Sequence, residues 1–229
     1  MDREVGVRSF APLWMTTKRQ IRGKLTHLHA VGGAGGARSK ALIEEIRACT
    51  VCAGSLAAGP RPVVQFSPAA RLVIIGQAPG SRVHESGVPW QDESGKRLRD
   101  WTGLSLAEFY DPAKTALVPM GFCYPGKGKS GDLPPRPECA PLWHDRVLAT
   151  LEDRRLTLLV GSYAQAHYLK TRNLTETVRG FRAHGTGVFP LPHPSWRSGI
   201  WMKRNPWFES DVLPALRAAV RGALEGSRT

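Results

Sequence analysis

The sequence predicts an α/β fold in which helices flank a central parallel sheet of four strands. The first observation is a set of four short apolar runs, each long enough for one buried strand. The second is that segments with helical apolar spacing separate these runs, and strands that alternate with helices favour a parallel sheet. A chain of 229 residues, 41% of them hydrophobic, can bury the core that one such domain needs.

Each element is expected where an apolar pattern and an end signal coincide. The expected strands are 71–76, 115–120, 156–161 and 187–192. The expected helices are 41–49, 95–101, 139–151, 162–169 and 209–220. Ser39 and Ser94 are candidate N-caps, because a serine side chain can accept hydrogen bonds from the first free N–H groups of a helix. Pro214 must lie near the first turn of the last helix, where its missing N–H is tolerated.

The start of the chain differs in composition from the rest. Residues 1–40 carry eight basic and two acidic side chains, and 31–38 read VGGAGGAR, which is typical of a flexible linker. We therefore expect a basic, flexible tail over 1–38 and one folded domain over 39–229. Two alternatives stay open: a solvated arm without a role, and a start codon placed too far upstream.

The net charge and the cysteine count narrow the possible classes of protein. A charge of +13 and a pI near 10.2 favour a polyanionic partner, of which nucleic acid is the simplest. No apolar run reaches the ~18 residues that would span a bilayer, and the first residues lack the apolar core of a secretory signal. Four cysteines are too few for a disulfide scaffold. We therefore expect a cytoplasmic, nucleoid-associated protein without a membrane partner.

The four cysteines form two pairs along the chain. Cys49 and Cys52 make a C-x2-C motif, and 15 residues separate Cys123 from Cys139. Thiolates at such spacings suit either a tetrahedral zinc site or an iron–sulfur cluster. Four buried, reduced thiols without a metal are the alternative.

Two of the expected strands end in sequences that favour a binding site. In a parallel α/β sheet the ligand lies beyond the carboxyl ends of the strands. Residues 76–80 read GQAPG, a tight loop that exposes backbone groups, and His193 follows the last strand between two prolines that restrict the backbone. An ordinary turn and a structural histidine are the respective alternatives.

Five motifs occur in one order along the chain, and together they resemble the uracil-DNA glycosylase superfamily. They are Cys49-x2-Cys52, GQAPG, Cys123-Tyr-Pro, Cys139 and His193-Pro194-Ser195. The order is nearest to the iron–sulfur branch called family 4, and the resemblance covers residues 39–222. It implies the three-layer fold of that superfamily and a [4Fe–4S] cluster on the four cysteines, with zinc as the alternative. The cluster would stabilise the structure by linking distant segments, and it would position a loop that faces DNA.

The same resemblance implies roles for residues at the expected strand ends. His193 would be catalytic by stabilising the departing base, and Gln77 by hydrogen-bonding the base or a water. Trp90 stands where family 4 has a phenylalanine that stacks on uracil, and a core tryptophan is the alternative. The other expected base-binding residues are Gly76, Ala78, Pro79 and Gly80.

Three departures from the family patterns bear on the reaction and on the choice of base. Gln77 replaces the glutamate of family 4, and Ala78 replaces the water-activating aspartate of family 1. Pro119 stands where many members have an asparagine that recognises uracil, so we expect bases beyond uracil, such as oxidised uracils or deaminated purines. The residue that orients the attacking water stays open. The candidates are Gln77, His84, Glu85, Asp92 and Glu93.

The segment after His193 predicts a DNA-binding loop. It interleaves tryptophans with basic residues, a pattern that suits unstacked bases and phosphates. Arg197 occupies the position of the family-1 residue that wedges into the space left by a flipped nucleotide. The expected DNA contacts are Ser195, Trp196, Arg197, Lys203 and Arg204. The alternative is that the tryptophans are core and the charges surface, and at least one tryptophan is expected in the core.

We therefore expect a monofunctional, monomeric DNA glycosylase that initiates base excision repair. It would flip uracil or a related damaged or deaminated base out of single- or double-stranded DNA and hydrolyse the N-glycosidic bond. The alternative is a glycosylase-like domain with weakened catalysis that binds damaged or single-stranded DNA. Retained Gln77, Trp90 and His193 favour the enzyme, whereas the missing aspartate and asparagine favour the binding domain.

Overall fold

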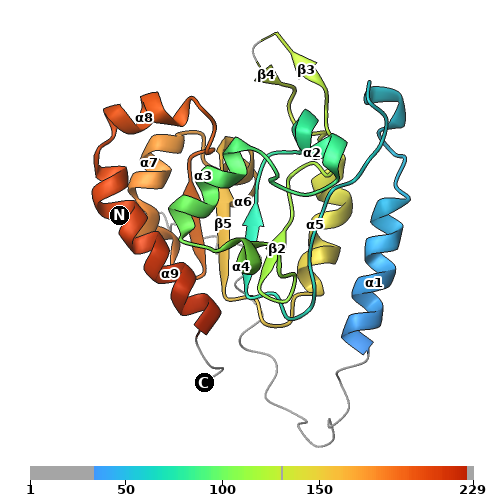
Figure 1. Cartoon of the computed structure of the whole chain (residues 1–229), viewed down its shortest axis with the longest axis horizontal. Coiled ribbons are helices and arrows are strands. Elements are labelled where there is room, and N and C mark those ends of the chain that lie inside the picture. Colours follow the sequence, from blue (N-terminus) through green and yellow to red (C-terminus); the bar gives the residue numbers. More distant parts are fainter. Residues whose placement is uncertain (1–33, 130, 226–229) are drawn as a thin grey trace, which may run out of the picture. The chain divides into compact units, whose positions relative to one another are not determined.

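Four parallel strands form the central sheet of the structure, a computed structural model that describes residues 34–129 and 131–225 (Figure 1). The strands are β1 (Leu72–Ile75), β2 (Thr115–Leu117), β5 (Leu156–Val160) and β6 (Val188–Leu191). Their order in the sheet is β2-β1-β5-β6, and every neighbouring pair is parallel. The predicted sheet is confirmed, and each strand lies within its expected range.

Both faces of the sheet are buried, which explains why the strand sequences are almost wholly apolar. Leu72 and Ile74 of β1 point into one core, whereas Val73 and Ile75 point into the other. Alternation along the strands therefore divides their side chains between two cores, one on each face.

Helices cover both faces of the sheet and complete the predicted layers (Figure 1). α1 and α5 pack on the core that holds Val73, and α3 and α9 pack on the core that holds Leu72. The described helices are α1 (Ala34–Arg47), α2 (Ser81–Ser86), α3 (Glu93–Thr102), α4 (Leu106–Tyr110), α5 (Cys139–Ala149), α6 (Ser162–Leu169), α7 (Leu174–Arg179), α8 (Ser198–Arg204) and α9 (Leu213–Glu225). Shorter helical turns are η2 (Ala53–Ser55), η3 (Phe181–His184) and η4 (Phe208–Val212).

The first helix begins earlier than predicted. α1 starts at Ala34 rather than after Ser39, so part of the expected linker is helical. Glycines lower helix propensity, which is why the composition indicated a linker. Gly35 lets this turn pass close to Glu152, because a Cβ atom there would lie 2.5 Å from the Oε1 atom. The rest of the expected basic tail, residues 1–33, lies outside the described residues.

The start of α3 also corrects a prediction. Asp92, not Ser94, is the N-cap, and its carboxylate accepts a 2.8 Å hydrogen bond from the backbone N–H of Gly95. The helix therefore begins at Glu93, close to the carboxyl edge of the sheet. Asp92 is held in a fixed orientation by this bond.

No pattern in the sequence predicts the antiparallel hairpin of β3 (Lys127–Gly128) and β4 (Gly131–Asp132). Strands of two residues are too short to show an alternating apolar pattern. Gly131 has φ +137°, a conformation that glycine adopts without strain. Figure 1 shows the hairpin projecting beyond the carboxyl ends of the sheet strands.

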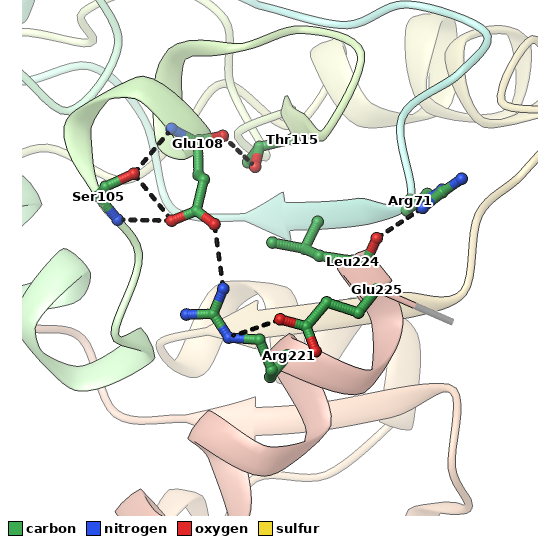
Figure 2. Close-up of polar contacts among 7 residues, drawn as sticks. All are labelled: Arg71, Ser105, Glu108, Thr115, Arg221, Leu224 and Glu225. Atoms are coloured by element: carbon green, nitrogen blue, oxygen red, sulfur yellow. Dashed lines mark hydrogen bonds and ion pairs between the residues drawn. The ribbon is translucent and has the colours of Figure 1, made fainter. Parts of the chain in front are cut away.

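Polar contacts fix α9 to α4 and to the start of β1 (Figure 2). Arg221 of α9 forms a 3.1 Å ion pair with Glu108. Glu108 also completes a capping box with Ser105 at the start of α4. Arg71, just before β1, donates a hydrogen bond to the backbone carbonyl of Leu224 near the end of α9. The last helix thereby closes the core on its face of the sheet.

The last helix extends further than predicted. η4 comes directly before α9, and Pro214 is the second residue of α9, in its first turn as expected. Among the described residues, no helix combines the length and the apolarity that a membrane span requires.

Candidate active site

A cavity of about 480 Å³ opens at the carboxyl edge of the sheet. Its walls come from the segments after β1, β2, β5 and β6 and from the β3–β4 hairpin, because parallel strands bring their carboxyl ends to one edge. The sequence-predicted residues that line it are Gln77, Ala78, Pro79, Gly80, Trp90, His193, Ser195, Trp196 and Arg197.

The loop after β1 forms one wall of the cavity. The backbone N–H of Met120 donates to the carbonyl of Gly76 at 2.9 Å, and the N–H of Gly121 donates to the carbonyl of Gln77 at 3.0 Å. Pro79 is buried, whereas Gln77 is only half-buried and keeps its amide at the cavity. The loop is therefore fixed to the segment after β2 through its backbone.

Trp90 lines the cavity in an unusual backbone conformation, with φ +58°. Its ring covers Gly76, where a Cβ atom would lie only 2.5 Å from the Cζ2 atom of the indole. Its carbonyl passes so close to Gly95 that any Cβ atom there would clash. Backbone strain of this kind persists where packing enforces it, and it is common at functional sites. Gly76, expected to contact the base, is instead buried beneath the indole and does not line the cavity.

The end of β6 directs His193 into the cavity. Gly161 lies beside the histidine and has φ +90°, a conformation that favours glycine; a Cβ atom there would be in ordinary contact, 3.4 Å from the Cβ atom of His193. The buried Gln165 donates a 2.8 Å hydrogen bond to the carbonyl of Leu191, two residues before the histidine. Both contacts restrict where the imidazole can lie.

The loop after His193 is tied to α3 by Arg97. The guanidinium donates to the carbonyl of Pro194 at 3.4 Å, to the hydroxyl of Ser198 at 3.3 Å, and also to the carbonyl of Ser195. One side chain therefore holds three groups of the loop. The loop is attached to the same helix whose start carries Asp92.

Burial and charge decide the protonation of His193. Burial lowers the pKa of the imidazole, and the carboxylate of Asp92 opposes this shift only in part. The imidazole is therefore neutral at pH 7, with one ring N–H available as a donor. The rings of Trp90 and His193 have centroids 5.9 Å apart and planes inclined by 29°. They present an aromatic surface and a hydrogen-bond donor to one space.

The mouth of the cavity carries an exposed aromatic residue and a cation. Trp196 is 72% exposed, and the guanidinium of Arg197 lies 5.2 Å from the centroid of its ring. Lys203 and Arg204 are exposed at the end of α8 and do not line the cavity. At least one tryptophan of this segment was expected in the core; Trp201 is half-buried and packs against the edge of the core.

The structure separates the candidates for orienting water into two groups. Gln77 and Asp92 line the cavity. His84, Glu85 and Glu93 lie outside its lining, and both glutamates are exposed. Asp92 already uses one carboxylate oxygen to cap α3.

Asp132 and Tyr163 line the cavity without having been predicted from the sequence. Tyr163 lies in the first turn of α6 and is 39% exposed. Asp132 belongs to β4 of the hairpin. The only sequence signal for it was a Ser-Gly-Asp turn between the third and fourth cysteines. That signal does not show that the turn folds back over the carboxyl ends of the strands.

The four cysteines line another cavity. Cys49 and Cys52 follow α1, Cys123 follows β2, and Cys139 is the first residue of α5, yet all four line this cavity. Among residues 34–129 and 131–225, no three His, Cys, Asp or Glu side chains are arranged to hold a single metal ion. The four thiols therefore share one space without forming a site for one ion.

Two thiols of this cavity, those of Cys123 and Cys139, are held in the protonated form. Burial raises the pKa of Cys123 to about 11 and that of Cys139 to about 12, and neighbouring cysteines add to both shifts. The backbone N–H of Phe122 donates to the Sγ atom of Cys139 at 3.3 Å, and Cys52 donates to the carboxylate of Glu138 at 3.9 Å. A metal that binds here would have to displace these protons.

A comparison with protein families agrees with this geometry. Residues 63–217 match the family model described as the Uracil DNA glycosylase superfamily. The match covers more than half of the chain and includes all four strands of the sheet, Trp90 and His193. Cys49 and Cys52 lie before its first residue.

Proposed function

The chain belongs to the uracil DNA glycosylase superfamily, and from this we propose that it excises a damaged or deaminated base from DNA by hydrolysing the N-glycosidic bond. Membership implies DNA as the partner. Uracil is the first candidate base. Base excision repair is the process that such a reaction initiates.

The observation that carries the proposal is the placement of Trp90 and His193 in one cavity at the sheet edge. A base that leaves the duplex loses its stacking and its pairing, so the pocket must offer an aromatic face and hydrogen-bonding groups. A cavity of about 480 Å³ lies in the usual range for small-molecule sites and has room for a nucleobase.

His193 supplies the chemistry that the reaction needs at the base. Cleavage of the N-glycosidic bond leaves its electron pair on the base, and negative charge spreads to the carbonyl oxygens. A neutral imidazole N–H can donate to such an oxygen, and the bond strengthens as the charge develops. Gln77 can hydrogen-bond the base or a water, but its amide cannot accept a proton.

The segment after β2 supports a broad choice of base. Pro119 lines the cavity and offers no side-chain amide that could distinguish uracil. Its carbonyl is already engaged, because the Nε2 atom of His144 lies 2.9 Å away. We therefore extend the proposed substrates to oxidised uracils and deaminated purines.

The mouth of the cavity supports contact with an unstacked strand. Trp196 is exposed enough to stack on a neighbouring base, and Arg197 can wedge or contact phosphate. Lys203 and Arg204 lie further out on α8, where they would contact phosphates beyond the flipped nucleotide.

A [4Fe–4S] cluster, as in the family-4 branch, is the proposed cofactor of the cysteine cavity. Two observations support it: the four thiols line one cavity, and a backbone N–H donates to the sulfur of Cys139. Cys49, Cys52, Cys123 and Cys139 would hold the cluster through their thiolates. The cluster would supply a structural staple, and the catalytic cavity is lined by none of its ligands.

The proposal is tested by incubating the purified protein with single- and double-stranded oligonucleotides that carry one uracil, oxidised uracil or hypoxanthine. Alkali then cleaves the strand at any abasic site. We expect cleavage at uracil and at one or more of the other bases. Trp90→Ala should slow every reaction by about 10- to 100-fold, because stacking contributes about 1–3 kcal/mol whichever base is bound.

Trp90→Phe is the matched control, because it keeps an aromatic face and should retain most of the rate. Binding without release of any base would favour the alternative, a domain that only recognises damaged or single-stranded DNA. Cleavage at uracil alone would contradict the broad choice of base and leave the glycosylase activity intact.

A further inference from the structure

We propose that Asp132, on the β3–β4 hairpin, is the catalytic carboxylate that orients and deprotonates the attacking water, an inference that rests on the glycosylase activity proposed above. The reaction needs a proton acceptor near the water. Ala78 has no polar side chain, and Gln77 has only an amide. The loop after β1 therefore lacks an acceptor of its own.

The hairpin brings a carboxylate to the place where the loop lacks one. Asp132 lines the cavity, and its Oδ2 atom lies 3.4 Å from the position that a Cβ atom would take on Gly80. Gly80 is the last residue of the GQAPG loop, so the carboxylate lies directly against that loop. The phenol of Tyr124 lies near Asp132 and acts on its pKa as a hydrogen-bond donor that favours the ionised carboxylate.

Asp92 is the only other carboxylate among the described residues that lines this cavity. Its Oδ1 atom accepts the 2.8 Å bond from Gly95 that caps α3. This bond fixes the Asp92 carboxylate at the start of α3, whereas Asp132 lies against the GQAPG loop, where the acceptor is missing. Asp132 has no such commitment to a helix.

The different burial of His193 and Asp132 agrees with a role for the histidine at the base and for the aspartate at the water. His193 is half-buried in the cavity, whereas Asp132 is exposed at its edge. A flipped base enters the cavity while its sugar stays near the mouth, with the strand outside. C1′ of the sugar would then lie between the histidine that contacts the base and the carboxylate that contacts the water.

The charged groups around Asp132 suit a base that works near neutral pH. Partial desolvation of the carboxyl group at the cavity edge raises its pKa and Asp92 adds to the shift, while Tyr124 and Lys127 oppose it. Lys127 is the residue paired with Asp132 in the hairpin register. A carboxylate with a raised pKa is a stronger base once it is ionised.

The proposed reaction conserves atoms and electrons among the water, Asp132, the sugar and the base. The water oxygen forms a bond to C1′ as the bond from C1′ to the base nitrogen breaks, and the electron pair leaves with the base. One water proton moves to the carboxylate of Asp132. His193 stabilises the anionic base, which then takes up the released proton, so the products are a neutral base and an abasic sugar.

Asp132→Asn tests the assignment, because asparagine keeps the shape of the side chain but cannot accept the proton. In single-turnover cleavage of whichever base the wild type releases, we expect a rate loss of at least about 100-fold. Affinity for DNA with a non-cleavable analogue should stay within threefold of wild type or become tighter. The fall in the wild-type rate at low pH should be lost in this variant.

Asp100→Asn is the matched control, because this exposed aspartate of α3 lies outside the cavity and should keep the wild-type rate. Tyr124→Phe should move the acidic limb of the rate profile to higher pH, since its hydrogen bond favours the ionised form. An active wild type with an unaffected Asp132→Asn variant overturns this inference alone. A larger loss for Asp92→Asn also overturns it. A wild type that releases no base overturns the proposed function, and this inference with it.

Discussion

His193 and Trp90 face one cavity, and each lies against a glycine. Gly161 lies beside the histidine, and Gly76 lies beneath the indole. Burial keeps the imidazole neutral by lowering its pKa. The position of each ring is thus set by neighbours that are distant in sequence, and its chemistry is set by burial.

Removing the imidazole should affect the rate far more than binding. His193→Ala should lower single-turnover excision by about 10²–10³-fold, because the lost hydrogen bond strengthens mainly as charge develops on the base. Affinity for DNA with a non-cleavable analogue should stay nearly unchanged. His184→Ala, outside the cavity lining, is the control. Equal losses of rate and affinity would make His193 a binding residue, and a rate within a few-fold of wild type would make it structural.

At the scale of elements, a buried polar network joins α5 and α6 to the segment after β2. His144 of α5 is 2% exposed, and its Nδ1 atom lies 2.6 Å from the hydroxyl of Tyr168 on α6. Its Nε2 atom lies 2.9 Å from the carbonyl of Pro119, which lines the active-site cavity. Burial lowers the pKa of His144 from 6.5 to about 4. The network therefore requires a neutral histidine.

The network should make the domain lose stability as the pH falls. Between pH 6.5 and about 4 the unfolded chain protonates His144 and the folded chain does not, so unfolding becomes more favourable. The shift corresponds to a loss of about 3 kcal/mol in the free energy of unfolding across that range. Urea unfolding at pH 7.5, 6 and 5 should show this fall in the wild type and a smaller one in His144→Gln.

His184→Gln is the control for that experiment, because His184 lies outside the buried network and the variant should keep the wild-type dependence on pH. A dependence that is equally steep in His144→Gln would mean that other groups cause the acid sensitivity.

At the scale of the whole molecule, the cysteine cavity joins segments that are far apart in the chain. Cys49 and Cys52 follow α1, while Cys123 and Cys139 lie before and after the hairpin that carries Asp132. A cluster bound there would hold both ends of this segment. It would thereby set the position of the hairpin over the active-site cavity.

Protein purified without oxidation should therefore be brown and contain four iron atoms per chain, as expected for a [4Fe–4S] cluster on four thiolates. Cys139→Ser should lose most of the iron and the visible absorption, and it should open the hairpin segment to proteolysis. Thr50→Ser, which lies between the first two cysteines without offering a thiol, should keep both. A colourless protein with one zinc per chain would contradict the cluster.

The sequence by itself determined the sheet, because each buried strand needs an apolar run and each crossover needs an amphipathic helix. It also singled out the loops that meet at the cavity, since carboxyl ends of parallel strands lie at one edge. The strand ranges and the placement of Gln77 and His193 at the cavity follow from these local rules, whereas Trp90 was expected there from the resemblance to the superfamily.

Only the tertiary structure decided which polar residues face the cavity. Local pattern could not show that Asp92 caps α3, that Gly76 lies beneath Trp90, or that a short hairpin returns Asp132 to the GQAPG loop. Each of these features depends on a contact between residues that the apolar periodicity of the sequence does not predict. A strand of two residues is too short to show an alternating pattern. The need for a glycine becomes clear only when the group that packs against it is known.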